Sequence, residues 1–210
     1  MPTIRFYRHA QSTKNEKPGF VGGRSNESPL TELGEQQASQ LGGALAFKEP
    51  KFVAAFCSGA KRTEQTGSLA LQAAGMDLPL QKHEGLLEIS QGKLWEGRDR
   101  QQPLILPDGT AETYTHPYTR GLDGRVTGGE SVAEVGWRME QALLEIANLY
   151  IDEERAEVAV FGHDFALRCL RVRLEDNPDH IRTSVDYCSE TTLSLQQAEL
   201  HITQFGRPLL

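Results

Sequence analysis

At 210 residues the chain is long enough to bury one substantial hydrophobic core, and we expect a single domain over residues 1–210. Apolar residues make up 38% of the sequence and charged residues 24%, which is ordinary for a globular protein, and no apolar run approaches the roughly 20 residues of a membrane-spanning helix. The net charge of −7, without a basic stripe or polybasic run, argues against nucleic acid and membrane surfaces as partners.

The three cysteines, Cys57, Cys169 and Cys188, are widely spaced and include no Cys-x-x-Cys pair. This spacing argues against a disulfide scaffold and favours reduced thiols. The first residues, MPTIRFYRH, lack the basic region and long apolar stretch of a signal peptide. We therefore expect a cytoplasmic protein.

The first half of the chain alternates strand and helix signals. Residues 3–8 predict a strand, and a loop rich in Gly, Asn, Ser and Pro follows it. Thr31 can cap a helix whose apolar residues follow helical spacing. The apolar run 51–57 predicts a buried strand, after which Ser58 can cap a helix that runs to Gly75.

The second half continues this alternation around one irregular segment. A short strand is expected near 78–82, and a helix from Ser131 has the clearest apolar periodicity of the chain. Between them, residues 90–128 are rich in Gly, Pro, Asp and Arg, and we interpret them as an excursion, with one short helix, that acts as a lid and recognises substrate. Residues 158–163 predict another buried strand, which runs into a helix that ends before Pro178.

Two segments of alternating character, 191–197 and 200–205, close the chain as a predicted hairpin. Strands that alternate with helices over short connections predict an α/β fold: a single-domain three-layer sandwich with a largely parallel central sheet and helices on both faces. Ligands bind such sheets beyond the carboxyl ends of the strands.

Reactive side chains follow three of these predicted strands. Arg8 and His9 end the first, Ser58 and Arg62 follow the second, and His163 follows the fourth. If the strands are parallel, these residues converge at one edge of the sheet. The planar guanidinium group of arginine can form paired hydrogen bonds with phosphate, and a helix N-terminus there adds backbone N–H donors. The pattern therefore predicts a phosphate-binding cleft.

Six segments resemble, in chain order, the motifs of one enzyme family. They are RHAQSTKN, SPLTELGEQQA, SGAKRTEQT, LLEISQGKLWEGR, GGESVAEV and VFGHDFALR. Together they cover nearly the whole chain, which resembles the histidine phosphatase superfamily, also called the phosphoglycerate mutase-like family.

The resemblance implies a mechanism through a covalent intermediate. His9 would be the nucleophile that attacks phosphorus and forms a phosphohistidine. Glu88 would protonate the leaving oxygen and later deprotonate the attacking water, a role that suits a carboxyl group whose pKa is raised beside a phosphate. The implied function is a phosphomonoesterase that needs no cofactor and acts on a small phosphorylated metabolite.

The same resemblance assigns the residues that hold the phosphoryl group. Arg8, Arg62 and His163 would hold its oxygens and stabilise their charge in the transition state. Asn15 matches the family's asparagine and would donate a further hydrogen bond. Asp164 follows His163 where the family often has Gly; it either sits near the phosphate and weakens dianion binding or hydrogen-bonds His163.

Two other functions stay open. A bisphosphoglycerate-dependent phosphoglycerate mutase uses the same pocket, but its family members resemble longer chains with a larger insertion; here Glu88 and Gly129 are 41 positions apart, and little chain follows the last strand to cover the cleft. A non-catalytic phosphate-binding protein on this fold is the other alternative. Retention of His9 and Glu88 favours an enzyme, and open access for water favours hydrolysis.

Several residues receive a structural interpretation. Cys57 is expected to be a buried apolar residue, and a zinc site from His9, His163, Glu88 and Cys57 is disfavoured because the arginines would repel the cation, so no metal is expected. Arg5 is unusual inside a central strand.

No pattern defines the oligomeric state, and a homo-oligomer is left open. The remaining histidines are expected on the surface, and the polar residues of the excursion in a solvated loop: His83, His116, His180 and His201; Arg98, Arg100, Arg120, Arg125 and Tyr118.

Overall fold

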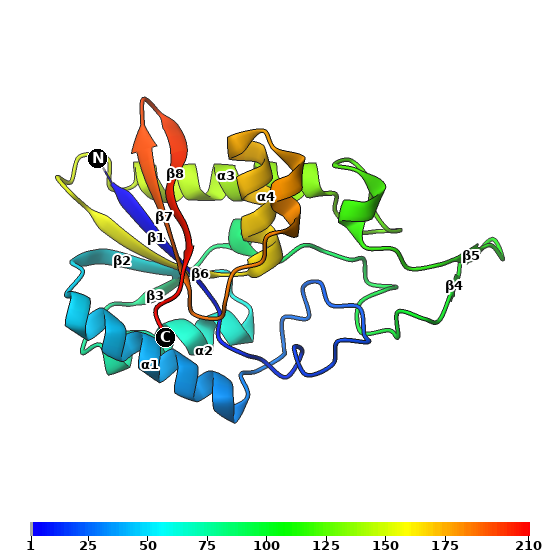
Figure 1. Ribbon diagram of the computed structural model, residues 1–210, viewed down its shortest axis with the longest axis horizontal. Helices are drawn as coiled ribbons and strands as arrows, with labels where there is room; N and C mark the ends of the chain where they lie inside the picture. The colour runs from blue at the N-terminus through cyan, green and yellow to red at the C-terminus, as the bar shows by residue number, and fades with distance from the viewer. Residues whose placement is uncertain (1) are drawn as a thin grey trace.

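The central sheet has the arrangement that the strand pattern predicts. In the computed structural model, which describes residues 2–210, six strands lie in the order β3-β2-β6-β1-β7-β8 (Figure 1). The four neighbouring strands β3, β2, β6 and β1 run parallel to one another. Strand β7 runs antiparallel to β1, and β8 forms a hairpin with β7. The bounds are β1 (Thr3–Arg8), β2 (Phe52–Cys57), β3 (Leu80–Lys82), β6 (Glu157–Gly162), β7 (Glu190–Gln196) and β8 (Glu199–Arg207).

Helices cover both faces of this sheet, so the expected α/β sandwich is confirmed (Figure 1). Side chains alternate across a strand, and along β1 Ile4 and Phe6 pack in the cluster formed with α3 and α4, whereas Tyr7 packs in the cluster formed with α1 and α2. The helices are α1 (Glu32–Lys48), α2 (Lys61–Ala73), α3 (Val132–Asn148) and α4 (Asp164–Glu175). None of the helices in residues 2–210 is long and apolar enough to cross a membrane.

Local caps explain where two of the helices begin. The Thr31 hydroxyl accepts the backbone N–H of Gly34 at 3.0 Å, as the sequence predicts. Ser131 and Glu134 form a capping box at the start of α3, in which each side chain accepts the backbone N–H of the other residue. These caps supply partners for N–H groups that the first turn of a helix leaves free.

The predicted cap at Ser58 is wrong. Helix α2 begins at Lys61, and Ala60 occupies the N-cap position without a side-chain hydrogen bond. The helix also ends at Ala73, before Gly75. The Ser58 hydroxyl lies two residues too early to cap this helix and makes contacts in the candidate site instead.

Two glycines allow the close approach of segments around the sheet edge. A Cβ at Gly34 would overlap the carbonyl oxygen of Gln11, so glycine lets the first turn of α1 support the loop after β1. A Cβ at Gly162 would overlap the ring of Phe6. Glycine at these two positions therefore lets α1 pack against the segment just after His9 and lets β6 pack against the segment just before Arg8.

The excursion predicted over residues 90–128 has little regular structure. It contains a two-stranded hairpin and one short 3-10 helix. Val21, Trp95, Leu104 and Val126 form a small buried cluster that packs the excursion against the loop after β1. The regular elements of this part and the remaining 3-10 turns are η1 (Glu84–Leu86), β4 (Leu104–Ile105), β5 (Ala111–Glu112), η2 (Pro117–Arg120) and η3 (Pro178–Arg182).

The arginine inside β1 has charged partners on the sheet. Strand β1 is central, between β6 and β7. Arg5 is only partly buried, and its guanidinium donates to Glu157 at 3.0 Å and to Glu190 at 3.4 Å. An arginine is therefore accommodated in a central strand because carboxylates from both adjacent strands meet it.

Candidate active site

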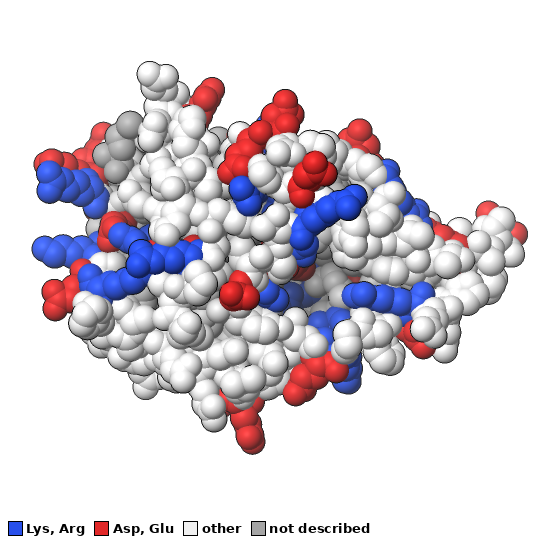
Figure 2. Space-filling view, in the orientation of Figure 1, with Lys and Arg blue, Asp and Glu red and all other residues white. Residues whose placement is uncertain are grey.

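The reactive strand ends lie together at one edge of the sheet. Arg8 pairs with Gly162, and Cys57 pairs with Phe161, so the residues that follow β1, β2 and β6 are neighbours. Of the predicted site residues, five line a single cavity of about 320 Å³: Arg8, His9, Asn15, Arg62 and Glu88. Figure 2 shows a hollow on this side of the molecule, with basic side chains on its rim.

His9 is held as a neutral ring with one free nitrogen. Its backbone N–H donates to the Gly162 carbonyl at 2.9 Å, and its Nδ1 lies 2.6 Å from the Ala10 carbonyl. Because a carbonyl only accepts, Nδ1 must carry the proton, and Nε2 keeps its lone pair. Burial, followed by the charges of Arg62 and Arg8, lowers the pKa of His9 well below its usual value. The ring is therefore neutral and presents a nucleophilic nitrogen.

His163 lies beside His9 and is oriented by a chain of hydroxyl groups. The two rings meet edge to face, with centroids 5.3 Å apart. Thr63 donates to the Ala60 carbonyl, so the Ser58 hydroxyl donates to Thr63 at 2.9 Å and accepts from His163 Nε2 at 2.8 Å. The proton of neutral His163 is therefore on Nε2.

The other ring nitrogen of His163, Nδ1, is buried and has no hydrogen-bond partner in the described chain. Burial, followed by the charges of Arg62 and other groups including His9, lowers the pKa of His163 well below its usual value. A buried nitrogen without a partner is uncommon and marks a place where a ligand can supply one.

Two arginines are anchored through part of their donors and keep the rest free. Arg8 donates to the Val185 carbonyl, its guanidinium lies 4.2 Å from the centre of the Tyr187 ring, and its buried Nε has no partner in the described chain. Arg62, 3% exposed, donates to the carbonyls of residues 24–25 at 3.0 and 2.9 Å. A guanidinium has five N–H donors, so both retain donors for an anion.

Asn15 turns its amide donor toward the same cavity. Its Oδ1 accepts both the backbone N–H of Ser12, at 3.0 Å, and the Ser12 hydroxyl, at 2.7 Å. The oxygen is thereby occupied, and the NH₂ group remains available for an anion. The local turn between the two residues explains why an asparagine six residues after His9 reaches the site.

Glu88 caps the beginning of α4. Its Oε1 accepts the backbone N–H groups of Ile89 and Ala166, both at 2.9 Å, and its Oε2 accepts that of Phe165 at 3.3 Å. Burial raises the pKa of Glu88, and the nearby charge of Asp164 adds to this, although the hydrogen bond from Ile89 lowers it. The carboxyl group is thus shifted toward the protonated form that a proton donor needs.

Asp164 holds the segment that supports Arg8. It accepts hydrogen bonds from Arg168 at 2.8 Å, from the Ser184 hydroxyl at 3.0 Å and from the backbone N–H of Val185 at 3.0 Å. Of the two alternatives from the sequence, a hydrogen bond to His163 is not found, and the side chain lines the cavity. Asp164 therefore fixes Val185, whose carbonyl binds the guanidinium of Arg8.

The cavity also includes residues that the sequence did not single out for it. The expectation that His116 lies on the surface is wrong: it is half-buried, lines the cavity and meets Phe165 edge to face and Tyr118 at a tilt, with ring centroids 4.9 and 4.3 Å away. Burial, then the charge of Arg100, lowers the pKa of His116 to about 4. The alternation of aromatic rings in Tyr-Thr-His-Pro-Tyr is a signal that could have indicated a packed face. Further lining residues are Lys14, Gln91, Arg100, Tyr114, Phe165 and Arg168.

The excursion's other arginines lie apart from the cavity. Arg120 pairs with Glu112 and Arg125 pairs with Glu134. Among residues 2–210, no group of three or more His, Cys, Asp or Glu side chains is arranged to hold a metal ion, so the zinc alternative has no support in the geometry. Cys57 is fully buried, and burial raises the pKa of its thiol, so it packs as an apolar residue.

Comparisons with known proteins agree with this geometry. Residues 4–207 match the sequence model of the histidine phosphatase superfamily (branch 1). The chain is 33% identical over 175 residues to a 2,3-bisphosphoglycerate-dependent phosphoglycerate mutase of Rhizobium etli, an alignment that covers 82% of this chain and 79% of the relative.

Solved structures with the same fold carry other names. A putative alpha-ribazole-5'-P phosphatase of Escherichia coli superimposes with a TM-score of 0.73 at 23% identity, over 97% of this chain and 95% of that one. A mycobacterial glucosyl-3-phosphoglycerate phosphatase solved with inorganic phosphate has a TM-score of 0.73 at 16% identity, over 99% and 98%. At these identities the likeness shows a shared fold.

Proposed function

The chain belongs to the histidine phosphatase superfamily, branch 1, and from that premise we propose that it is a phosphomonoesterase that hydrolyses a small phosphorylated metabolite through a phosphohistidine at His9. One observation carries the proposal. A neutral His9, with its lone pair on Nε2, shares a cavity with two arginines and with Glu88, a carboxyl group of raised pKa.

In the first step, His9 Nε2 attacks phosphorus. A P–N bond forms while the P–O bond to the leaving group breaks, and the Glu88 proton passes to the leaving oxygen. The product alcohol leaves, and the phosphoryl group remains on His9. The hydrogen bond from Nδ1 to the Ala10 carbonyl stabilises the positive charge that develops on the ring.

In the second step, water reverses this exchange. The Glu88 carboxylate takes a proton from water, the water oxygen attacks phosphorus, and the P–N bond breaks. Inorganic phosphate is released, and His9 and protonated Glu88 are restored. One carboxyl group serves as acid and then base because the same site faces both the leaving oxygen and the incoming water.

Four further residues stabilise the transferred phosphoryl group. Arg8, Arg62 and Asn15 donate the N–H groups that their own contacts leave free. His163 donates from Nδ1 after that nitrogen is protonated. Because His163 is neutral in the free protein, binding of a phosphate dianion is coupled to uptake of a proton.

Phosphoglycerate mutase activity is the second candidate, and the 33% identity to a phosphoglycerate mutase favours it. A mutase uses the same first step but transfers the phosphoryl group back to a bound phosphoglycerate. Support for hydrolysis comes from the site itself: the cavity is lined by the end of β1 and the loop after it, by α2, by residues between 88 and 116 and by the first turns of α4, and by none of β7 or β8. The short separation of Glu88 and Gly129, 41 positions, also supports hydrolysis, because it leaves little chain to exclude water from the phosphohistidine.

The test measures phosphate release from a panel of phosphomonoesters, including an aryl phosphate, by the wild type and by His9→Ala without metal or bisphosphoglycerate. We expect release by the wild type and its loss in His9→Ala. A parallel assay with 3-phosphoglycerate and bisphosphoglycerate measures mutase turnover. No release from any compound, with mutase turnover present, would replace the phosphatase proposal by the mutase; activity in neither assay would leave a phosphate-binding protein.

A further inference from the structure

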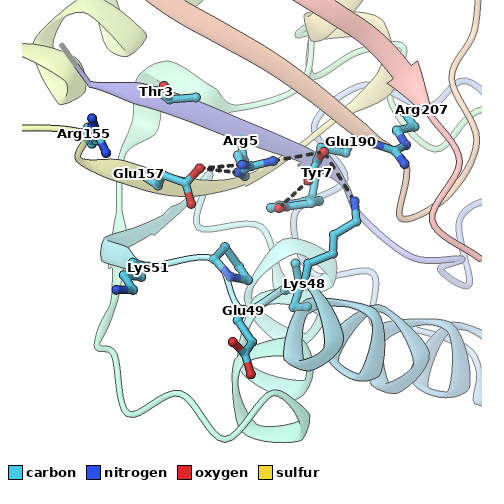
Figure 3. A pocket seen from close by; sticks show the side chains of 12 residues that line it. Thr3, Arg5, Tyr7, Lys48, Glu49, Lys51, Arg155, Glu157, Glu190 and Arg207 are labelled. Atoms are coloured by element: carbon cyan, nitrogen blue, oxygen red, sulfur yellow. Dashed lines mark hydrogen bonds and ion pairs between the residues drawn. The ribbon is translucent and has the colours of Figure 1, made fainter.

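A second cavity, larger than the catalytic one, lies between the end of α1 and the sheet. Its volume is about 760 Å³, within the usual range for small-molecule sites. Figure 3 shows side chains from β1, β6, β7 and β8 converging on it with those from the last turn of α1. The two cavities share no lining residue.

The charged residues of this second cavity leave an excess of cations. Five basic side chains line it, against three carboxylates, in a chain whose net charge is −7. Two of the carboxylates, Glu157 and Glu190, are already paired with Arg5. The third, Glu49, points away from that cluster in Figure 3. The five basic residues are Arg5, Lys48, Lys51, Arg155 and Arg207.

Three of these cations lack a carboxylate partner within the cavity. Lys51 and Arg207 make no ion pair and no side-chain hydrogen bond with any residue of 2–210. Arg155 approaches only its exposed neighbour Glu154, at 3.9 Å. Unpaired cations around a concave surface raise the local concentration of anions.

A buried carboxylate positions the other two cations at the floor. Glu190 is 1% exposed and accepts the Tyr7 hydroxyl at 2.9 Å. Arg5 approaches the Glu190 carboxylate at 3.4 Å and Lys48 at 3.7 Å, both longer than the 2.7–2.9 Å of a strong charged hydrogen bond. Glu190 thus holds Lys48 near the cavity while its ammonium retains three N–H groups, and Arg5 keeps only the N–H groups that Glu157 and Glu190 do not accept. Lys48 also offsets the negative end of α1.

We infer that this cavity binds a small molecule with two or more anionic groups, phosphate or carboxylate. One group would meet Arg5 and Lys48 at the floor, and another would meet the unpaired Arg207 or Lys51 at the rim. Cations separated across one cavity favour a ligand with separated charges over a single phosphate. The inference stands apart from the catalytic proposal because it uses none of the residues of the catalytic cavity.

Calorimetric titration tests this assignment, with pyrophosphate and citrate as separate probes. The parent protein is His9→Ala, which prevents turnover and leaves the second cavity intact. Adding Lys48→Gln and Arg207→Gln should remove one equivalent of bound probe or weaken that site at least tenfold. The control pair, Arg173→Gln with Arg182→Gln, changes the net charge equally on the opposite layer and should leave the titration unchanged.

The outcomes separate the sources of the anion. Loss with pyrophosphate alone assigns a phosphorylated ligand, loss with citrate alone assigns a polycarboxylate, and loss with both assigns any polyanion. Equal titrations before and after the double substitution overturn the inference. If that variant does not fold, the backbone amide signal of Gly206, beside Arg207, is followed in the parent protein during pyrophosphate titration, and an unchanged signal overturns it as well.

Discussion

Replacement of Glu88 by glutamine separates its role in proton transfer from its role as a helix cap. Both 2.9 Å bonds, from Ile89 and Ala166, go to Oε1, which the glutamine oxygen can replace. Only the 3.3 Å bond from Phe165 to Oε2 is lost, because an NH₂ group cannot accept it. One unsatisfied backbone donor costs about 1–3 kcal/mol, or roughly 2–12 °C in Tm for a chain of this size. Glu88→Gln should therefore fold.

The effect on catalysis should depend on the leaving group. With an alkyl phosphate, loss of the general acid should lower kcat by about 10²–10⁴, which corresponds to about 3–5 kcal/mol of barrier. A nitrophenolate leaves without a proton, so its release in the first turnover should fall by less than about tenfold. The second step still needs Glu88 as base, so phosphohistidine should accumulate after that turnover.

Stopped-flow measurement of nitrophenolate release checks this expectation. Glu88→Gln should show a burst of about one equivalent per enzyme followed by slow turnover. Glu84→Gln, an exposed residue four positions earlier, is the matched control and should retain wild-type kinetics. Equal losses for alkyl and aryl substrates, without a burst, would refute proton transfer by Glu88 and leave only its contact with α4.

The pH dependence of Glu88 has a defined sign. A carboxyl group whose pKa is raised on folding contributes stability that is lost as pH rises from its unfolded pKa of about 4.3 through the folded value. Glutamine has no such loss, so the Tm deficit of Glu88→Gln should shrink between pH 4 and 7. In the wild type, the rate with an alkyl phosphate should fall as pH rises through the same folded pKa. A Tm deficit that stays constant over this range would contradict the assignment.

Two substitutions and one titration test the surroundings of the site. Ser58→Ala removes the acceptor of His163 Nε2–H and should lower the free energy of unfolding by about 1–3 kcal/mol in a urea titration; an unchanged value would contradict the hydroxyl chain. Asp164→Asn removes a charge that raises the pKa of Glu88, so the alkaline limb of the pH–rate profile should move to lower pH; a shift upward would contradict that coupling. His116, with a pKa of about 4, should titrate near that value by NMR, and its contribution to stability should be lost as pH falls from about 6.5 toward 4; a midpoint above 6 would contradict its burial.

Local patterns in the sequence determined the elements of the fold and the motif residues of the site. Apolar runs and helical periodicity located the strands and helices within a few residues, and the Thr31 cap was visible because capping involves neighbours only three residues apart. The position of reactive residues directly after β1, β2 and β6 predicted their meeting, because parallel strands bring their carboxyl ends to one edge.

Only the tertiary structure decided what depends on contacts between distant segments. Ser58 was expected to cap α2, but the arrival of His163 from β6 makes its hydroxyl part of the site. His116 belongs to the cavity because the excursion packs it against Phe165 of α4. The partners of Arg5 are 152 and 185 residues away, on strands that flank β1. Periodicity and caps act over a few residues and can be read along the chain, whereas a partner across the sheet is chosen by strand order and register, which no local pattern encodes.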